Sequence, residues 1–197
     1  MRKVVLAGAL VWMANTGLAA EVGEFGQGHM GLGYGLANLD FEVDLGSEKV
    51  SMGSSPQLAE VWWKGYLNRY VALEGRFGVG TNDDESDVSL GSFSANTDVV
   101  TWEIDHYAAV NLVFQYPFGK VAPRLSVGYN KVNLKVNLKD FGSLSDTDGD
   151  VYVGIGADIQ VSPKWGVALD FSDHYGKKDD GVDASITSFR MGIYHTY

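Results

Sequence analysis

Cysteine is absent from this sequence of 197 residues, and proline occurs only four times. Without cysteine the chain has no disulfide framework and no thiol for lipid attachment or metal binding. Basic residues are also few, with 15 Lys and Arg against 25 Asp and Glu. Because phosphate recognition needs a basic surface, this balance argues against a nucleic-acid partner, and the acidic excess is typical of a solvated surface.

Long apolar runs are missing beyond the first twenty residues. At the N-terminus, Arg2 and Lys3 precede an apolar run over residues 4–13, and Ala19 and Ala20 follow as a cleavage site. This pattern predicts a cleaved signal peptide over residues 1–20 and one domain over residues 21–197. No later run approaches the ~18 apolar residues of a transmembrane helix, which excludes a helical membrane protein.

A period-two alternation of apolar and small or polar residues recurs eight times along the rest of the chain. In the first run Met30, Leu32 and Tyr34 alternate with Gly31 and Gly33. The eight runs cover residues 28–41, 57–67, 71–81, 100–116, 121–130, 151–161, 165–175 and 187–197. Such runs are typical of half-exposed β-strands.

The connections between these runs alternate in length. Short ones cover residues 68–70, 117–120 and 162–164, and long polar ones cover residues 42–56, 82–99, 137–150 and 176–183. Short periplasmic turns and longer extracellular loops give this rhythm in outer-membrane barrels. We therefore predict an all-β fold, an eight-stranded antiparallel transmembrane β-barrel in the cell outer membrane. Three short turns are expected to pair Leu67 with Val71, Tyr116 with Val121, and Val161 with Trp165.

The distribution of charge predicts which face meets lipid. One face of the strands is nearly free of charge over its middle rows, as a lipid-facing surface requires. Aromatic residues near the periplasmic ends fit an interfacial girdle: Tyr70, Tyr116, Phe118, Trp165 and Tyr197. The residues predicted to point outward include Leu73, Phe77, Val127, Ile155, Leu169 and Ile193. The apolar row of residues 100–116, which includes Ile104, is expected on the same face. In a soluble barrel or sandwich the two faces would be reversed.

The opposite face carries four acids and four bases. These eight residues are Glu60, Lys64, Glu74, Arg76, Arg124, Asp158, Asp170 and Arg190. Charges so crowded inside a barrel must pair, and register places Lys64 opposite Glu74 and Trp62 opposite Arg76. Since eight strands leave just enough interior for side chains, the pattern favours a plugged lumen, with a narrow pore for small solutes as the alternative.

Candidate enzymatic and metal sites are weak. Asp170, Ser172 and His174 lie at alternate positions of one strand, about 6.6–6.8 Å apart, which is too far for a catalytic triad. Residues 146–150 look like part of a calcium loop but lack the distal Glu, so a loop turn is expected there. We predict neither enzyme activity nor a bound cofactor or metal. A lipid-modifying enzyme is the third and least favoured hypothesis.

Three stretches carry a resemblance to a known family: GYLNRYVALEGRFGVG (65–80), GIGADIQVSPKW (154–165) and FRMGIYHTY (189–197). Together they make the chain similar to small outer-membrane β-barrels of the porin family, including opacity-type and OmpA-like transmembrane domains. The resemblance implies that the last strand is an assembly signal for the barrel-insertion machinery, read from Phe189, Met191, Ile193 and Tyr197. His195 departs from the family's apolar or aromatic pattern.

Fold and resemblance together predict the partners and the function. Outer-membrane lipid and lipopolysaccharide are the expected surroundings, and the acidic loops are the expected contact with any extracellular partner. The favoured function is a structural or surface-interaction role, in adhesion or envelope integrity, with a small porin as the alternative.

Overall fold

The computed structural model describes residues 27–44, 49–82, 84–90, 93–138, 142–179 and 182–197. The expected signal peptide, residues 1–20, lies outside this part. All named elements are strands: β1 (Gly28–Asp44), β2 (Lys49–Ser54), β3 (Gln57–Asn68), β4 (Val71–Gly80), β5 (Asp84–Leu90), β6 (Phe93–Gln115), β7 (Val121–Leu138), β8 (Gly142–Gln160), β9 (Trp165–Asp179) and β10 (Val182–Thr196). No helix among the described residues is long and apolar enough to cross a membrane.

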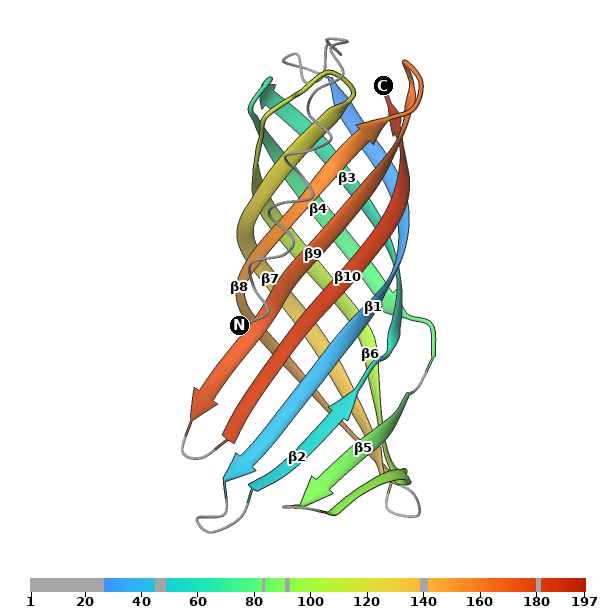
Figure 1. Ribbon diagram of the computed structural model, residues 1–197, viewed down its shortest axis with the longest axis vertical. Coiled ribbons are helices and arrows are strands. Elements are labelled where there is room, and N and C mark those ends of the chain that lie inside the picture. The colour runs from blue at the N-terminus through green and yellow to red at the C-terminus, as the bar shows by residue number, and fades with distance from the viewer. Residues whose placement is uncertain (1–26, 45–48, 83, 91–92, 139–141, 180–181) are drawn as a thin grey trace.

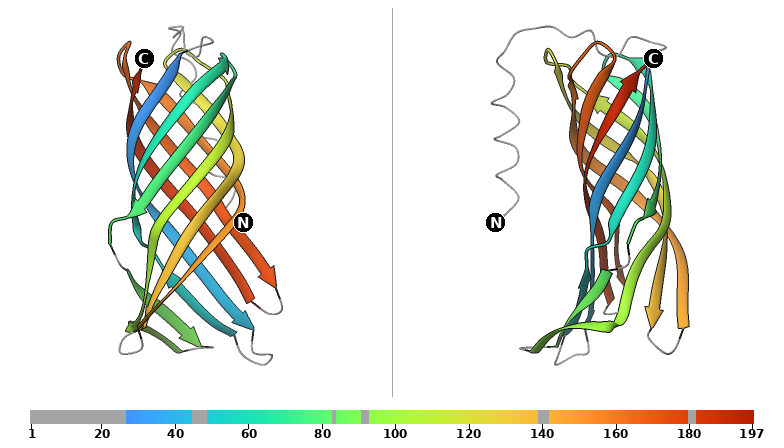
Figure 2. Two further views of the ribbon diagram at one scale, coloured as in Figure 1. Left: turned by 180° about the vertical axis from the view of Figure 1, so that it is seen from behind. Right: turned by 90° about the vertical axis from the view of Figure 1, so that its right-hand side faces the viewer.

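The ten strands form one closed barrel with eight strand positions, because two of these positions are each shared by two successive strands (Figures 1 and 2). Ser54 of β2 and Gln57 of β3 pair with Leu39 and Leu36 of β1 in one continuous register, so β2 and β3 are two parts of one broken strand. β4 and β5 likewise succeed one another along β6. Antiparallel pairing of β1 with β10 closes the ring. The predicted eight-stranded antiparallel barrel is confirmed.

The long polar segments predicted as loops are mostly strand, and in this respect the expectation was wrong. The ladder between β7 and β8 continues to Leu138 and Gly142, and that between β9 and β10 continues to Asp179 and Val182. Residues 146–150, expected in a loop turn, lie in β8. Backbone pairing needs no apolar face, so a ladder can continue where the alternation of apolar residues ends. The hairpins extend well beyond the barrel at the lower end of Figure 1.

The short turns at the other end differ in two cases from the predicted pairings. Asn68, and not Leu67, lies opposite Val71, because Asn68 Oδ1 accepts hydrogen bonds from the amides of Tyr70 (2.8 Å) and Val71 (3.0 Å). A bulge at Leu67 restores the register beyond the turn.

The second difference lies between β6 and β7. Phe118, and not Tyr116, lies opposite Val121, because Gly119 has a φ of +58° that permits a two-residue turn. The pairing of Val161 with Trp165 is confirmed by a hydrogen bond of 2.9 Å between their backbones.

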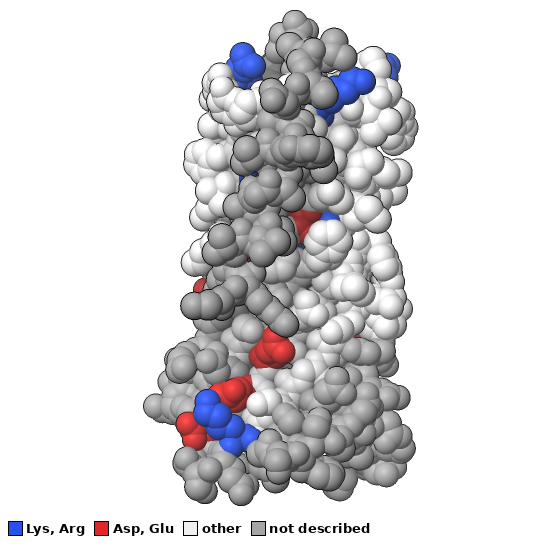
Figure 3. Space-filling model, viewed as in Figure 1, with Lys and Arg blue, Asp and Glu red and all other residues white. Residues whose placement is uncertain are grey.

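The outer wall of the barrel is apolar, as predicted. Five of the six residues expected to point outward are 39–55% exposed, namely Leu73, Phe77, Val127, Ile155 and Ile193. Leu169 is partly exposed on the same face and pairs with the exposed Met191. In Figure 3, the visible charges at the end with the short turns are Lys and Arg, those at the other end are acidic and basic residues side by side, and the coloured surface between them is mostly white with few charged atoms.

One predicted outer residue faces inward. Ile104 is only 2% exposed, because an irregularity in the pairing of β6 with β7 between Ile104 and His106 reverses the alternation at Asp105. The alternation alone placed Ile104 with the lipid-facing row. A bulge changes the face of every residue beyond it, and the alternation does not show where a bulge lies.

Candidate functional site

The eight charged residues of the predicted lumen network are all buried, none more than 6% exposed. They come from six strands: β3, β4, β7, β8, β9 and β10. Their side chains form one connected set of ion pairs across the barrel, and because four are acidic and four basic the set is formally neutral. A buried charge is tolerated only when it is paired, so equal numbers of acids and bases are what allow eight charges to lie inside the barrel.

Of the four acids in the network, Asp170 and Glu74 have the largest number of basic partners. Oδ2 of Asp170 accepts hydrogen bonds from Arg76 (2.5 Å) and Arg124 (2.8 Å), and Arg190 approaches it to 3.6 Å. Glu74 accepts from Nε of Arg76 at 2.5 Å and from Nη1 of Arg124 at 2.8 Å. Both carboxylates therefore clamp the same two guanidinium groups, which fixes those side chains across the lumen.

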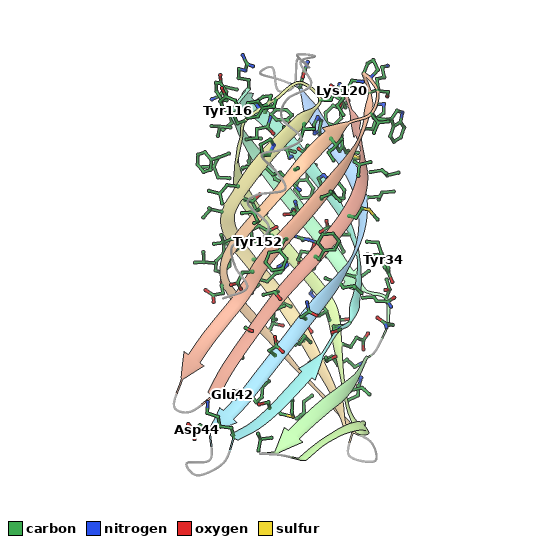
Figure 4. The ribbon with its side chains drawn as sticks, viewed as in Figure 1. Tyr34, Glu42, Asp44, Tyr116, Lys120 and Tyr152 are labelled. Carbon is green, nitrogen blue, oxygen red and sulfur yellow. The ribbon has the colours of Figure 1, made fainter. Side chains whose placement is uncertain are left out.

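Arg190 joins the ion pairs to two tyrosines. It donates to Glu60 at 2.9 Å, to the Tyr107 hydroxyl at 2.8 Å and to the Tyr152 hydroxyl at 2.5 Å. Tyr107 in turn donates to Glu60. Figure 4 shows Tyr152 projecting into the barrel, whereas Tyr34 points away from it. The network thus fills the interior at this level with hydrogen-bonded side chains.

Lys64 has a different main partner from the one predicted. It lies opposite Glu74 in the register, as expected, but its Nζ is 3.9 Å from Glu74 Oε2 and hydrogen bonds instead to Asp158 across the lumen. Glu74 already accepts from Arg76 and Arg124, and the flexible lysine stem lets the ammonium reach Asp158, whose other oxygen lies 3.5 Å from Arg124. Cross-strand register alone cannot reveal contacts that span the barrel.

We expect Lys64 and Asp158 to behave as one energetic unit. Lys64→Met and Asp158→Leu should each lower the stability by about 3–5 kcal/mol, since each leaves one buried charge without its partner. The double variant should lose less than the sum of the two, because it leaves no unpaired charge. Urea unfolding of the folded barrel in lipid vesicles measures this coupling. A second double-mutant cycle, with Lys64→Met and Glu74→Leu, is the matched control and should give the smaller coupling energy. A larger coupling energy for Lys64 with Glu74 than for Lys64 with Asp158 would contradict Asp158 as the main partner.

Glycines make room for the large side chains of the lumen. A Cβ atom at Gly31 would lie 2.2 Å from Trp62, and one at Gly192 would lie 2.3 Å from the same indole. Trp62 also lies under Arg76, whose guanidinium carbon is 5.9 Å from the ring centroid. The inner face of β1, where glycines leave room, is therefore the surface on which Trp62 packs. This explains why glycine alternates with apolar residues there.

Ser172 and His174 lie closer together than predicted. Their side chains are 3.2 Å apart, and the same His174 nitrogen is 2.7 Å from the Ser188 hydroxyl. An irregular pairing opposite His174, between Ile186 and Thr187, turns the imidazole toward its neighbours. The other imidazole nitrogen faces Asn130 at 3.0 Å and not Asp170, which is taken up by arginines. The set therefore lacks the carboxylate–histidine pair of a triad.

Inside the barrel, an apolar layer lies on the side of the network that faces the extended hairpins. This layer was not predicted. Its buried members are Ala37, Leu39, Leu58, Ile104, Tyr107, Val132 and Ile186, with Leu134 packed against them. The signal was present in the sequence, since Ala37, Leu39 and Leu58 continue the inward-facing rows beyond the charges. No group of three or more His, Cys, Asp or Glu that could hold a metal ion occurs in the part of the chain that the structure describes.

The predicted assembly residues lie on β10, the strand that closes the barrel. Phe189, Met191 and Ile193 are exposed on the outer face and pair with residues of β1, and Tyr197 is exposed at the end with the short turns. His195 is partly buried with its ring 4.9 Å from that of Trp165. The structure thus places these side chains on one lipid-facing row, and their part in assembly stays a prediction.

A closed antiparallel barrel with an apolar outer wall and an ion-paired interior defines the class of transmembrane β-barrels. The sequence matches the family of outer membrane protein beta-barrel domains over residues 7–193, and the chain belongs to this family. Membership supports an outer-membrane location. A comparison with curated proteins finds no match.

Several solved structures are similar to this chain. OprG from Pseudomonas aeruginosa has a TM-score of 0.61 at 10% identity, over 89% of this chain and 97% of that one. Neisserial surface protein A has a TM-score of 0.58 at 11% identity, over 84% and 96%. Ail, the attachment invasion locus protein of Yersinia pestis, has a TM-score of 0.53 at 13% identity, over 88% and 99%. At these identities the likeness shows the shared fold alone.

Proposed function

We propose that this protein is an integral outer-membrane barrel with a structural or surface-interaction role, in adhesion or envelope integrity, and that its lumen is a plug. The observation that carries the proposal is the packing of the interior. The cavity among Glu60, Arg76, Arg124, Asp170 and Arg190 has no room for a water molecule. Side chains that fill the lumen at this level leave small solutes no open path there, which supports a role of the charges in holding the barrel together.

The extended hairpins are the surface offered to a partner. The four segments predicted as extracellular loops contain 15 Asp and Glu and four Lys. Such a surface attracts cationic partners and repels polyanions. One structure of Ail contains the heparin analogue sucrose octasulfate, a highly anionic molecule. The acidity of the hairpins in this chain supports a partner of the opposite charge, such as a basic protein surface.

Planar-bilayer recordings test the plug. We expect no steady conductance from the unaltered protein. The double variant Arg124→Ala with Asp170→Ala should open a measurable conductance, because it removes two crossing side chains while keeping the lumen neutral. Lys135→Ala with Glu103→Ala removes a partly exposed pair, 3.4 Å apart, and is the matched control that should stay closed. Steady conductance of the unaltered protein would overturn the plug and establish the small-solute channel instead.

A further inference from the structure

A small cavity lies inside the barrel on the outer side of the apolar layer. Its volume is about 40 Å³. Its lining is mainly apolar, with Leu39, Phe41, Met52, Leu134, Ala184 and Ile186, and Asp40, Gly53, Ser54 and Ser185 complete it. The strands that contribute are β1, β2, β7 and β10. We call this cavity the outer pocket.

Register shows that the outer pocket belongs to the lumen and not to the lipid-facing wall. Leu39 pairs with Ile186, and both are buried inside the barrel. Phe41, two residues further along β1, pairs with Met52 on one side and with Ala184 on the other. Opposed residues share a face, and so do residues two apart on a strand. The walls therefore continue the inward-facing rows toward the extracellular end.

The outer pocket has a closed floor. The buried residues Ala37, Leu58, Ile104 and Val132 lie beneath it, and the ion-paired network follows below them. A molecule entering from the extracellular side thus reaches an apolar chamber and not a passage.

A chamber with mainly apolar walls above a lumen packed with side chains points to an apolar ligand. We propose that the outer pocket binds the apolar end of a small amphiphile. A cavity needs about 10–15 Å³ by this measure to hold one water molecule, so the outer pocket accommodates a chain end of about three or four carbon atoms. Apolar walls hydrate poorly, and an apolar group replaces that water favourably.

The charges around the mouth define the other end of the ligand. On β1, Asp40, Glu42 and Asp44 lie at this level on the face opposite to the inward-facing Leu39 and Phe41, so they surround the mouth from outside, and β2 carries Lys49, which is paired with Glu42. Figure 4 shows Glu42 and Asp44 at the hairpin end of the barrel. The net negative potential disfavours an anionic head group. The ligand class is therefore an amphiphile with a short apolar end and a neutral or cationic head.

Methionine methyl NMR of the whole chain in lipid nanodiscs tests this proposal, with hexylammonium, hexan-1-ol and hexanoate as added compounds. Met52 lines the outer pocket, while Met30 and Met191 face lipid and report partition into the bilayer. We expect the Met52 methyl shift to saturate with hexylammonium and hexan-1-ol and to respond more weakly to hexanoate. The Met30 and Met191 shifts should change only linearly with concentration.

A filled-pocket variant is the matched control. Ala184→Phe, or Ala184→Leu if the larger residue prevents folding, should abolish the saturable Met52 shift, whereas Ala108→Phe on the exposed face should leave it unchanged. The proposal would be overturned if all three methyls shifted together without saturation, or if saturation survived the filling. Equal responses to hexanoate and hexylammonium would overturn the assigned head group. None of these outcomes depends on whether the lumen conducts.

Discussion

Replacing Asp170 with alanine should lower the free energy of unfolding of the barrel by about 3–5 kcal/mol, the cost of removing one member of a buried ion pair. Asp170 accepts hydrogen bonds from Arg76 and Arg124 and lies 3.6 Å from Arg190. Its loss leaves a net positive charge in an interior that has no room for water at this level. The substitution removes one partner from each of Arg76, Arg124 and Arg190, which few other single substitutions in this protein would do.

Urea unfolding in lipid vesicles, followed by tryptophan fluorescence and by heat-modifiable migration, measures the effect. Asp173→Ala on the same strand is the matched control, because Asp173 is exposed on the outer face. We expect the control to unfold at nearly the unaltered urea concentration. If the two variants lost stability equally, the destabilisation would not come from the buried network, and the central place of Asp170 would be wrong.

The sequence predicted the wall of the barrel well because the wall follows a strictly local rule. Side chains alternate between faces with a period of two, and each face meets a different environment, so residues such as Leu73 and Glu74 reveal their sides from their neighbours alone. The same rule failed at Ile104, since the adjacent bulge at Asp105 leaves no compositional signature.

The interior was less predictable because its contacts are set by the closed ring. Alternation identified the eight lumen charges, but cross-strand register suggested Glu74 as the partner of Lys64, whereas Asp158 reaches it from the far wall. Ser172 and His174 meet for a similar reason, because an irregularity on the neighbouring strand reorients the imidazole. These contacts depend on how far each strand is offset from the next around the ring, which no local pattern records.

The hairpins show where the alternation stops being informative. Beyond the membrane the two faces of a strand meet similar surroundings, so polar residues there are compatible with strand and with loop alike. The ladders of β7 with β8 and of β9 with β10 continue into this region by backbone pairing. The rim is thus built of strands where the composition suggested loops, and the walls of the outer pocket come from four of these strands, β1, β2, β7 and β10.

Changing Tyr197 to lysine should block assembly of the barrel almost completely while leaving export across the inner membrane intact. Tyr197 exchanges backbone hydrogen bonds with Gly28 (3.1 and 3.2 Å), so it makes the last contact between the two ends of the barrel. A Cβ atom at Gly28 would lie 2.6 Å from its ring, which shows how closely the aromatic side chain lies over the first strand. The resemblance to porin-family barrels also implies that a terminal aromatic residue guides insertion. A lysine keeps the backbone hydrogen bonds with Gly28 but supplies neither the ring contact with the first strand nor the aromatic residue.

The measurement is the amount of heat-modifiable folded barrel in outer-membrane fractions, compared with the total exported protein. Tyr116→Lys is the matched control, because Tyr116 is also an exposed tyrosine at the same end, near the turn between β6 and β7 (Figure 4). We expect the control to assemble at reduced but substantial levels, since it loses one interfacial anchor and leaves the closing strand unchanged. Normal amounts of folded barrel for Tyr197→Lys would refute a terminal assembly signal. Equal losses for both variants would instead assign the effect to the aromatic girdle, because only a signal on β10 makes the last residue more sensitive than its interfacial neighbours.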